Sequence, residues 1–128
     1  MNERINSPAL SKPPSYSHVA VASGRIVFAA GAVPLDGDGR VVGPGDRAMQ
    51  TRQVLDNLRV QLAAAGASPT NVVKTTVYVV ATTMEELDSV WDLVAASDFA
   101  GAPSTLLGVT VLGYPGQLVE IEAVAVID

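Results

Sequence analysis

Few side chains in this chain of 128 residues could act as nucleophiles, bases or metal ligands. The absence of cysteine excludes disulfides, thiolate catalysis and zinc sites with cysteine ligands. Because the chain has a single histidine, His18, sites built from several histidines are excluded. We interpret His18 as structural or exposed. A group of carboxylates precedes and follows Leu87 with no further ligands nearby, so we interpret it as a solvated helix face: Glu85, Glu86, Asp88 and Asp92. We therefore predict no metal site.

The remaining candidates are two glutamates near the C-terminus. Glu120 and Glu122 lie within an apolar segment (118–127) whose residues alternate in the manner of a β-strand. Both glutamates fall on the same face of that strand. A carboxylate half-buried on such a face could act as a general acid or base.

Two amphipathic helices and several strands must position these carboxylates. Asp46 can cap a helix that ends at Gly66, and Thr83 with Glu86 forms a capping box at the start of a second helix. Strand patterns cover 17–22 and 25–30, which we predict to pair as a hairpin, then 41–42, 72–80, 104–112 and 118–127. We expect an irregular arm over residues 1–15 and a single α+β domain over 16–128. That domain has one mixed sheet of five or six strands with two helices on one face.

The predicted sheet has apolar residues on both faces, although the helices can cover only one of them. In segments 72–80, 104–112 and 118–127, valine and leucine occur at both odd and even positions. An exposed apolar patch of that size is unusual on a monomer. We therefore expect self-association through the uncovered face, with Glu120 and Glu122 at or near the subunit interface. The alternative is a monomer with a lightly apolar sheet face.

Charge and hydropathy exclude several other classes of protein. The net charge is −5, and the eight basic residues are spread from Arg4 to Lys74 without forming a patch, which argues against a nucleic-acid partner. No apolar run reaches the length that spans a bilayer, and the N-terminal segment lacks the apolar region of a signal peptide. We expect a cytoplasmic protein with no membrane partner.

Five stretches in this order and spacing resemble the RidA/YjgF family, also called the L-PSP endoribonuclease-like family. They are GAVP (31–34), QTRQVLDNL (50–58), AAGAS (64–68), VVKTTVYV (72–79) and LVEIEA (118–123). The resemblance covers residues 16–127. It implies a chorismate-mutase-like fold and a homotrimer around an inner barrel, with small-molecule clefts at the subunit interfaces. Its best-studied members hydrolyse enamines or imines such as 2-aminoacrylate to a keto acid and ammonia without a cofactor.

The resemblance assigns roles to residues of this chain. Glu120 matches the glutamate that positions or activates the attacking water; the alternative is a structural residue paired with an amide of a neighbouring subunit. The arginine that binds the substrate carboxylate is replaced by Ser104, or by Thr105 if the register shifts by one, and a cysteine two residues later is replaced by Leu106 or Leu107. A hydroxyl could hydrogen-bond a carboxylate but would not neutralise it.

Four further positions are expected to line the same cleft. Tyr16 matches an N-terminal tyrosine, Ala30 stands where deaminating members have a serine, and Gly31 offers a backbone N–H. Trp91 stands where they have an asparagine, although it also fits the apolar stripe of its helix. An enamine or imine deaminase is therefore one reading, and a non-catalytic module that binds a small metabolite is another. A nuclease or translation inhibitor is less consistent with an acidic chain that has one histidine.

Overall fold

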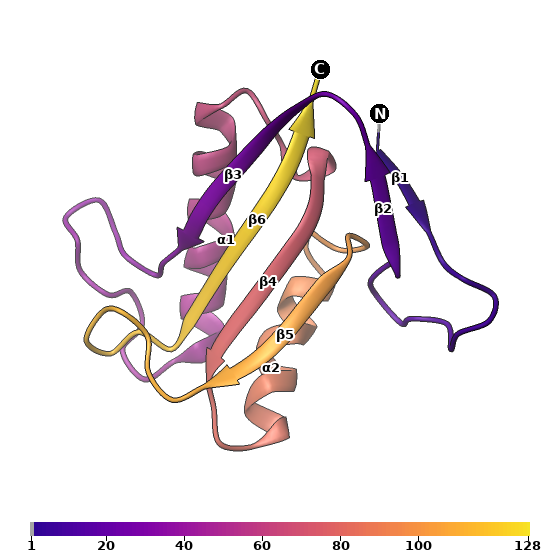
Figure 1. Ribbon diagram of the computed structural model, residues 1–128. Helices are drawn as coiled ribbons and strands as arrows, with labels where there is room; N and C mark the ends of the chain where they lie inside the picture. The colour runs from indigo at the N-terminus through magenta and orange to yellow at the C-terminus, as the bar shows by residue number, and fades with distance from the viewer. Residues whose placement is uncertain (1) are drawn as a thin grey trace.

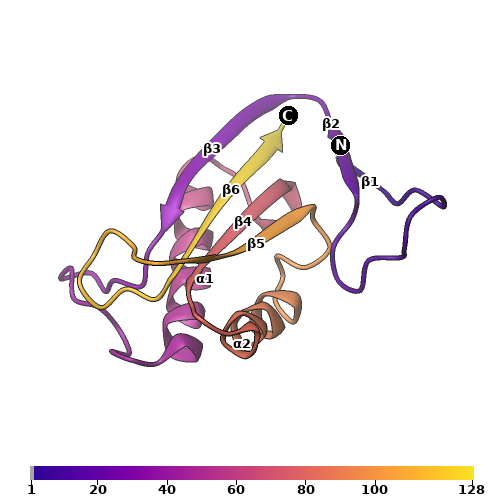
Figure 2. The ribbon, with the colours of Figure 1, turned by 60° about the horizontal axis from the view of Figure 1, so that its bottom comes forward.

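The structure is a computed structural model that describes residues 2–128, in which two helices cover one face of a four-stranded mixed sheet (Figures 1 and 2). The strand order is β3-β6-β4-β5. In chain order the elements are β1 (Asn2–Ile5), β2 (Val19–Ala22), β3 (Arg25–Ala32), α1 (Arg47–Ala64), a 3₁₀ turn (Pro69–Asn71), β4 (Val72–Val80), α2 (Met84–Ala95), β5 (Ser104–Val109) and β6 (Val119–Ile127).

The sheet mixes antiparallel and parallel pairs, which confirms the α+β prediction. The C-terminal strand β6 lies in the interior of the sheet and pairs antiparallel with both β3 and β4. The parallel strands β4 and β5 are joined by α2, as expected because parallel neighbours need a crossover connection, which is usually a helix. The connection through α1 joins β3 to β4, which are not neighbours, because β6 separates them. The C-terminal strand β6 therefore fills the position between β3 and β4 in the sheet.

The N-terminal prediction was wrong in two respects. Residues 1–15 are not wholly irregular, because β1 pairs antiparallel with β2 in a separate two-stranded sheet. The predicted hairpin of 17–22 with 25–30 does not form, and the chain bends at Gly24, whose φ is 140°. The physical reason is that β3 pairs with β6, an apolar strand that is longer than β2. Because β6 lies far away in the sequence, a local pattern cannot reveal this pairing. Beside the β5 edge, the arm is held by a bond from Asn2 Nδ2 to the Val72 carbonyl (2.9 Å).

Other boundaries also differ from the sequence patterns. The short strand expected at 41–42 is only an isolated bridge between Leu35 and Val41. The sheet strand expected over 104–112 ends at Val109, and residues 110–118 form a loop. Both helix starts agree with the predictions, since Asp46 accepts a hydrogen bond from the Met49 N–H and Thr83 accepts one from the Glu86 N–H.

The core lies between the helices and the covered sheet face. Its fully buried side chains include Leu58 and Leu62 of α1, Val90 of α2, Val77 of β4 and Ile121 of β6. Within residues 2–128, no helix is long and apolar enough to cross a membrane.

On the opposite side of the sheet, here called the open face, no helix or strand from residues 2–128 is packed (Figure 2). Phe28 of β3 is 76% exposed there and Ile26 is 59% exposed. Polar side chains share this face along the two inner strands: Lys74, Thr76 and Tyr78 on β4, and Glu120 and Glu122 on β6. The open face of a single chain is therefore a mixture of exposed apolar groups and a few half-buried charged groups.

Candidate functional site

The Glu120 carboxylate lies on the open face, at the end of β6 where the chain enters the sheet. Its Oε1 accepts a hydrogen bond of 3.0 Å from Gln117 Nε2, and Gln117 is only 3% exposed. Its Oε2 lies against Gly31 of β3, where a β-carbon would overlap the carboxylate. The carboxylate is thus held from two directions, by a buried amide and by the backbone of β3.

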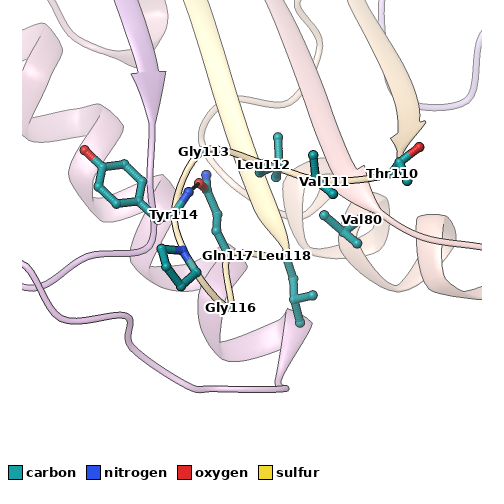
Figure 3. Close-up of a pocket in the computed structure, with 10 residues that line it drawn as sticks. Val80, Thr110, Val111, Leu112, Gly113, Tyr114, Gly116, Gln117 and Leu118 are labelled. Atoms are coloured by element: carbon teal, nitrogen blue, oxygen red, sulfur yellow. Dashed lines mark hydrogen bonds between the residues drawn. The ribbon is translucent and has the colours of Figure 1, made fainter.

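The loop over residues 110–118 supplies that amide. The Gln117 side chain accepts from the Tyr114 N–H (3.1 Å) and donates to the Val119 carbonyl (3.1 Å), which anchors the loop to the start of β6. The loop borders a cavity of about 490 Å³, with Val80 and Val111 toward one end and Tyr114 at the other (Figure 3). Tyr114 is 48% exposed and forms part of this cavity lining.

A second glutamine fixes the loop from the helix side. Gln50 of α1 is fully buried, and its Oε1 accepts from the Leu118 N–H at 2.7 Å. Its Nε2 donates to the carbonyls of Gly116 (3.0 Å) and Gly43 (3.2 Å). Sequence reasoning missed the positioning contacts of Gln50 and Gln117. A signal existed for Gln50, because a polar residue on the apolar stripe of a buried helix needs a partner.

Glu122 has a different environment from Glu120. Tyr78 of β4 donates a hydrogen bond of 2.5 Å to Glu122 Oε1. This bond is the main cause that raises the pKa of Tyr78, and desolvation and the nearby carboxylates act in the same direction. Tyr78 therefore stays protonated well into the alkaline range and remains a donor to Glu122.

Four of the predicted residues meet on the helix side of β5, in what is here called the aromatic pocket. Tyr16, Trp91, Ser104 and Leu106 line a cavity of about 260 Å³. The rings of Tyr16 and Trp91 meet edge to face, with centroids 6.4 Å apart and planes at 74°. Trp91 also packs against the core and donates from Nε1 to Ser15 Oγ at 3.0 Å. Trp91 therefore lies both against the core and in the lining of this pocket.

Ser104 and Thr105, the two positions that the resemblance offered for the family arginine, lie on opposite faces of β5, because neighbouring residues of a strand point to opposite faces. Ser104 lines the aromatic pocket together with Leu106, and its Oγ accepts from Thr75 Oγ1 at 2.7 Å. Thr105 faces the other way and accepts a bond of 2.6 Å from Lys74 Nζ. Of these two residues, Ser104 is the one that lies beside Tyr16 and Trp91.

The predicted site residues thus form two groups on opposite sides of the sheet. Glu120 and Gly31 lie together at the β3–β6 end of the open face, and Ala30 is exposed beside them on β3, with its carbonyl bonded to Gln61 Nε2 (3.0 Å). The aromatic pocket lies across the sheet near the β5 edge. One chain does not bring the two groups together.

His18 and the acidic helix face take no part in either group. The His18 Nδ1 accepts from the Ser7 N–H (3.0 Å), and Nε2 lies 3.2 Å from the Ser11 carbonyl, so the ring fastens the arm. Glu86 is paired with Arg47 at 2.6 Å, and hydrogen bonds from the Thr82 N–H and the Thr83 hydroxyl help to lower the pKa of Glu86. Among residues 2–128, no group of three or more histidine, aspartate or glutamate side chains could hold a metal ion.

Comparison with known proteins gives one family match that covers nearly the whole chain. Residues 6–127 match the sequence profile of the family described as Endoribonuclease L-PSP. A RutC family protein of Pyrococcus horikoshii is 35% identical over 128 residues, which is 98% of each chain. The mouse 2-iminobutanoate/2-iminopropanoate deaminase is 36% identical over 121 residues, covering 94% of this chain and 85% of the mouse protein.

The fold has a close counterpart among solved structures. The crystal structure of YyfB from Yersinia pestis, a member of the Rid protein family, superposes with a TM-score of 0.90. The two sequences are 34% identical, and the superposition covers 98% of each chain.

Proposed function

Since the chain belongs to the endoribonuclease L-PSP family, also called the RidA/YjgF family, we propose that it hydrolyses a small enamine or imine to a carbonyl compound and ammonia. One of its relatives, the mouse protein, is named for this class of reaction. The observation that carries the proposal is the placement of the Glu120 carboxylate. Oε1 is fixed by Gln117, whereas Oε2 accepts no hydrogen bond from any residue in the described range 2–128.

This geometry suits a carboxylate that holds a water molecule. The backbone of β3 at Gly31 and the buried Gln117 amide restrict the carboxylate to one orientation. As the water oxygen adds to the imine carbon, Glu120 takes the water proton and returns it to the imine nitrogen. The resulting amino alcohol then loses ammonia as its carbon–nitrogen bond breaks and the carbonyl forms. The reaction consumes one water and needs no oxidant or reductant.

We place the complete site between copies of the chain. The aromatic pocket and the Glu120 group lie on opposite faces of one protomer, so a substrate can touch both only where two protomers meet. The exposed apolar side chains of the open face favour such contact, because burying them contributes roughly 25 cal/mol per Å². In a closed ring, each copy contacts its two neighbours through two different surfaces, and every contact in the ring is equivalent. In this proposal the assembly is a homotrimer with three equivalent sites.

The test is imine hydrolysis by the Glu120→Gln variant. An amino-acid oxidase or a flavin-dependent amine oxidase generates the imine, and release of ammonia is followed with and without the protein. Loss of the base should lower the acceleration by about 10²–10⁴-fold. The matched control is Glu122→Gln, which changes the same residue type two positions along the same strand face and should retain most of the acceleration. Equal loss in both variants would contradict the assignment of Glu120.

Mixing two inactive variants tests whether the site is shared. Glu120→Gln leaves the aromatic pocket intact, and Trp91→Ala leaves Glu120 intact. If each site combines groups from two copies, subunit exchange should restore about a quarter of the sites in an equal mixture. Activity that stays absent in mixtures shown to exchange would contradict a shared site.

Binding without catalysis is the second candidate function, and the composition of the aromatic pocket favours it. No basic side chain from the described residues, 2–128, lines that pocket, so the pocket does not reproduce a charge-assisted carboxylate site. Under this alternative, a panel of imines gives no acceleration, whereas small ligands still raise the unfolding temperature.

A further inference from the structure

Within residues 2–128, the lining of the aromatic pocket has no charged residue, and the helix that borders it carries no basic residue. Its lining consists of two aromatic rings, one leucine and one serine hydroxyl, from Tyr16, Trp91, Leu106 and Ser104. All four charged residues of α2, the helix that carries Trp91, are carboxylates, and β5 has no charged residue. Transferring a carboxylate from water into such a pocket is strongly unfavourable unless a cation accompanies it.

The cations of this region are directed elsewhere. Lys74 is the last basic residue of the sequence, and its ammonium lies on the open face, where it donates to Thr105. Arg4 of the arm donates to the Ala100 carbonyl at 3.3 Å and lines a different cavity together with Asp98. Across the proposed interface, the Glu120 group would contribute a carboxylate. No basic side chain among residues 2–128 therefore lines the aromatic pocket.

One polar group in the pocket is able to bind a neutral ligand. The Ser104 Oγ accepts its bond from Thr75, a side chain only 1% exposed, so the serine oxygen is fixed in place. Its own proton remains available for donation to an oxygen or nitrogen acceptor. A site built around one hydroxyl and two aromatic rings discriminates by shape and by a single hydrogen bond.

We infer that the aromatic pocket selects uncharged substrates, namely small neutral imines or their enamine tautomers without a carboxylate. This inference rests on the proposed function for its reaction. For an imine of the form R₂C=NH, the water oxygen bonds to carbon, both water protons end on nitrogen, and the products are R₂C=O and NH₃. The group R occupies the pocket between Tyr16 and Trp91, with Ser104 as its polar contact. Carboxylated imines such as 2-iminopropanoate are then poor substrates of this chain.

A matched pair of ligands tests the pocket without any catalysis. The compounds 2-methylpropanamide and 2-methylpropanoate have the same shape and differ in charge. Thermal unfolding and calorimetric titration of the wild-type protein should show the amide binding at least about tenfold more tightly than the carboxylate. Equal or tighter binding of the carboxylate, or binding of neither, overturns the inference.

Two variants locate the cause of the preference. Ser104→Arg places a guanidinium in the pocket and should shift the preference toward the carboxylate by about tenfold or more. Lys74→Met removes the cation on the other face and should leave the preference unchanged. If Lys74→Met alone changes carboxylate binding, the ligand lies on the open face and the inference is wrong. The comparison in wild-type protein stands even if Ser104→Arg fails to fold.

Rates separate this inference from the proposed function. A flavin-dependent amine oxidase acting on butylamine supplies a neutral imine, and a D-amino-acid oxidase acting on alanine supplies 2-iminopropanoate. We expect ammonia release from the neutral imine to be accelerated at least about tenfold more. Faster hydrolysis of 2-iminopropanoate overturns the inference and leaves the proposed function intact. Amide binding without hydrolysis of either imine overturns the proposed function and leaves the pocket selectivity intact.

Discussion

At the scale of single residues, Gly31 decides where the Glu120 carboxylate can lie. The carboxylate rests against the α-carbon of Gly31, in the space that any side chain would take. Gly31 does not have a positive φ, so an alanine there would be compatible with the backbone and would act by displacing Glu120. The glycine therefore serves close approach rather than an unusual backbone conformation.

We predict that Gly31→Ala lowers imine hydrolysis by about tenfold or more, because a displaced carboxylate no longer holds water at the reacting carbon. The cost in stability should stay within about 1–3 kcal/mol, as for other overpacked sites. Kinetics and urea denaturation measure the two effects separately. The matched control is Gly37→Ala, since a β-carbon at Gly37 meets nothing within 4 Å. Unchanged activity in Gly31→Ala would remove the steric role assigned to Gly31.

At the scale of elements, α1 stabilises the loops at both ends of the site through polar side chains on its buried face. Gln50 binds the loop before β6, and Asn57 Nδ2 donates to the carbonyls of Val33 (2.7 Å) and Leu35 (2.9 Å) in the loop after β3. The helix thus has a stripe that is only partly apolar. Gln50 and Asn57, its polar residues, fix the loops that flank Glu120 and Gly31 to the same helix, α1.

Gln50→Leu tests this connection. The variant keeps a similar volume but leaves the Leu118 N–H and two carbonyls without partners, so unfolding free energy should fall by about 2–4 kcal/mol. Urea denaturation provides the measurement. Gln61→Leu is the control, because Gln61 makes one bond in a more exposed position and should cost less than about 1 kcal/mol. An equal loss of unfolding free energy in the two variants would show that the buried hydrogen bonds of Gln50 stabilise the fold no more than the exposed bond of Gln61.

A bidentate ion pair joins α1 to the segment after α2. Arg59 Nη2 lies 2.8 Å from Asp98 Oδ1, and Arg59 Nε lies 3.0 Å from both carboxylate oxygens. The hydrogen bonds from Arg59 are the main cause that lowers the pKa of Asp98. Because the folded-state pKa is lower than the unfolded one, this pair stabilises the fold above the unfolded pKa and loses its effect as the pH falls through the folded value.

Asp98→Asn should therefore lower unfolding free energy near neutral pH by up to about 1 kcal/mol, since the pair is half-exposed. The difference from wild type should shrink as the pH falls below about 4, where Asp98 becomes protonated in the unfolded and then in the folded chain. Urea denaturation at pH 7 and at pH 2.5 checks this. The control is Asp88→Asn, an exposed change of the same type on α2, which should cost less unfolding free energy than Asp98→Asn at pH 7. A difference that stays constant across this range would exclude the proposed linkage.

At the scale of the whole molecule, the sheet has one covered face and one open face, and the two groups of site residues fall on different sides of it. The two helices cover only one face of the sheet, and the apolar core lies between them and that face. The open face keeps Phe28 and Ile26 exposed beside half-buried Glu120 and Glu122. Self-association would cover the apolar side chains and join the two parts of the site in one step.

Phe28→Asp is expected to reduce the particle mass from about three times 13.2 kDa to that of one chain, because it puts a charge into the apolar contact. Light scattering coupled to size exclusion measures the mass. Met84→Asp is the matched control, since Met84 is 77% exposed, against 76% for Phe28, and lies at the start of α2 away from the open face. A wild-type particle of one chain mass, or an unchanged mass in Phe28→Asp, would contradict assembly through this face.

Local patterns in the chain were sufficient for its helices, its long strands and its fold class. Asp46, Thr83 and Gly66 mark helix ends through contacts within a few residues, and the alternation in β6 assigns Glu120 to the face opposite Ile121. Such features depend on neighbours in sequence, so a single sequence carries them.

Contacts between distant segments were decided only in the tertiary structure. They include the pairing of β3 with β6, the separate β1–β2 sheet and the bond from Gln117 to Glu120, with Gln50 fixing the same loop. The placement of Ser104 beside Tyr16 and Trp91, with Thr105 on the other face, also depends on the packed arrangement. Many apolar strands could pair with similar energies. The pairing that forms is the one that buries the apolar strand faces against α1 and α2. A one-residue shift reverses the face of every side chain in β5, so the register of that edge strand decided which hydroxyl lies beside Tyr16 and Trp91.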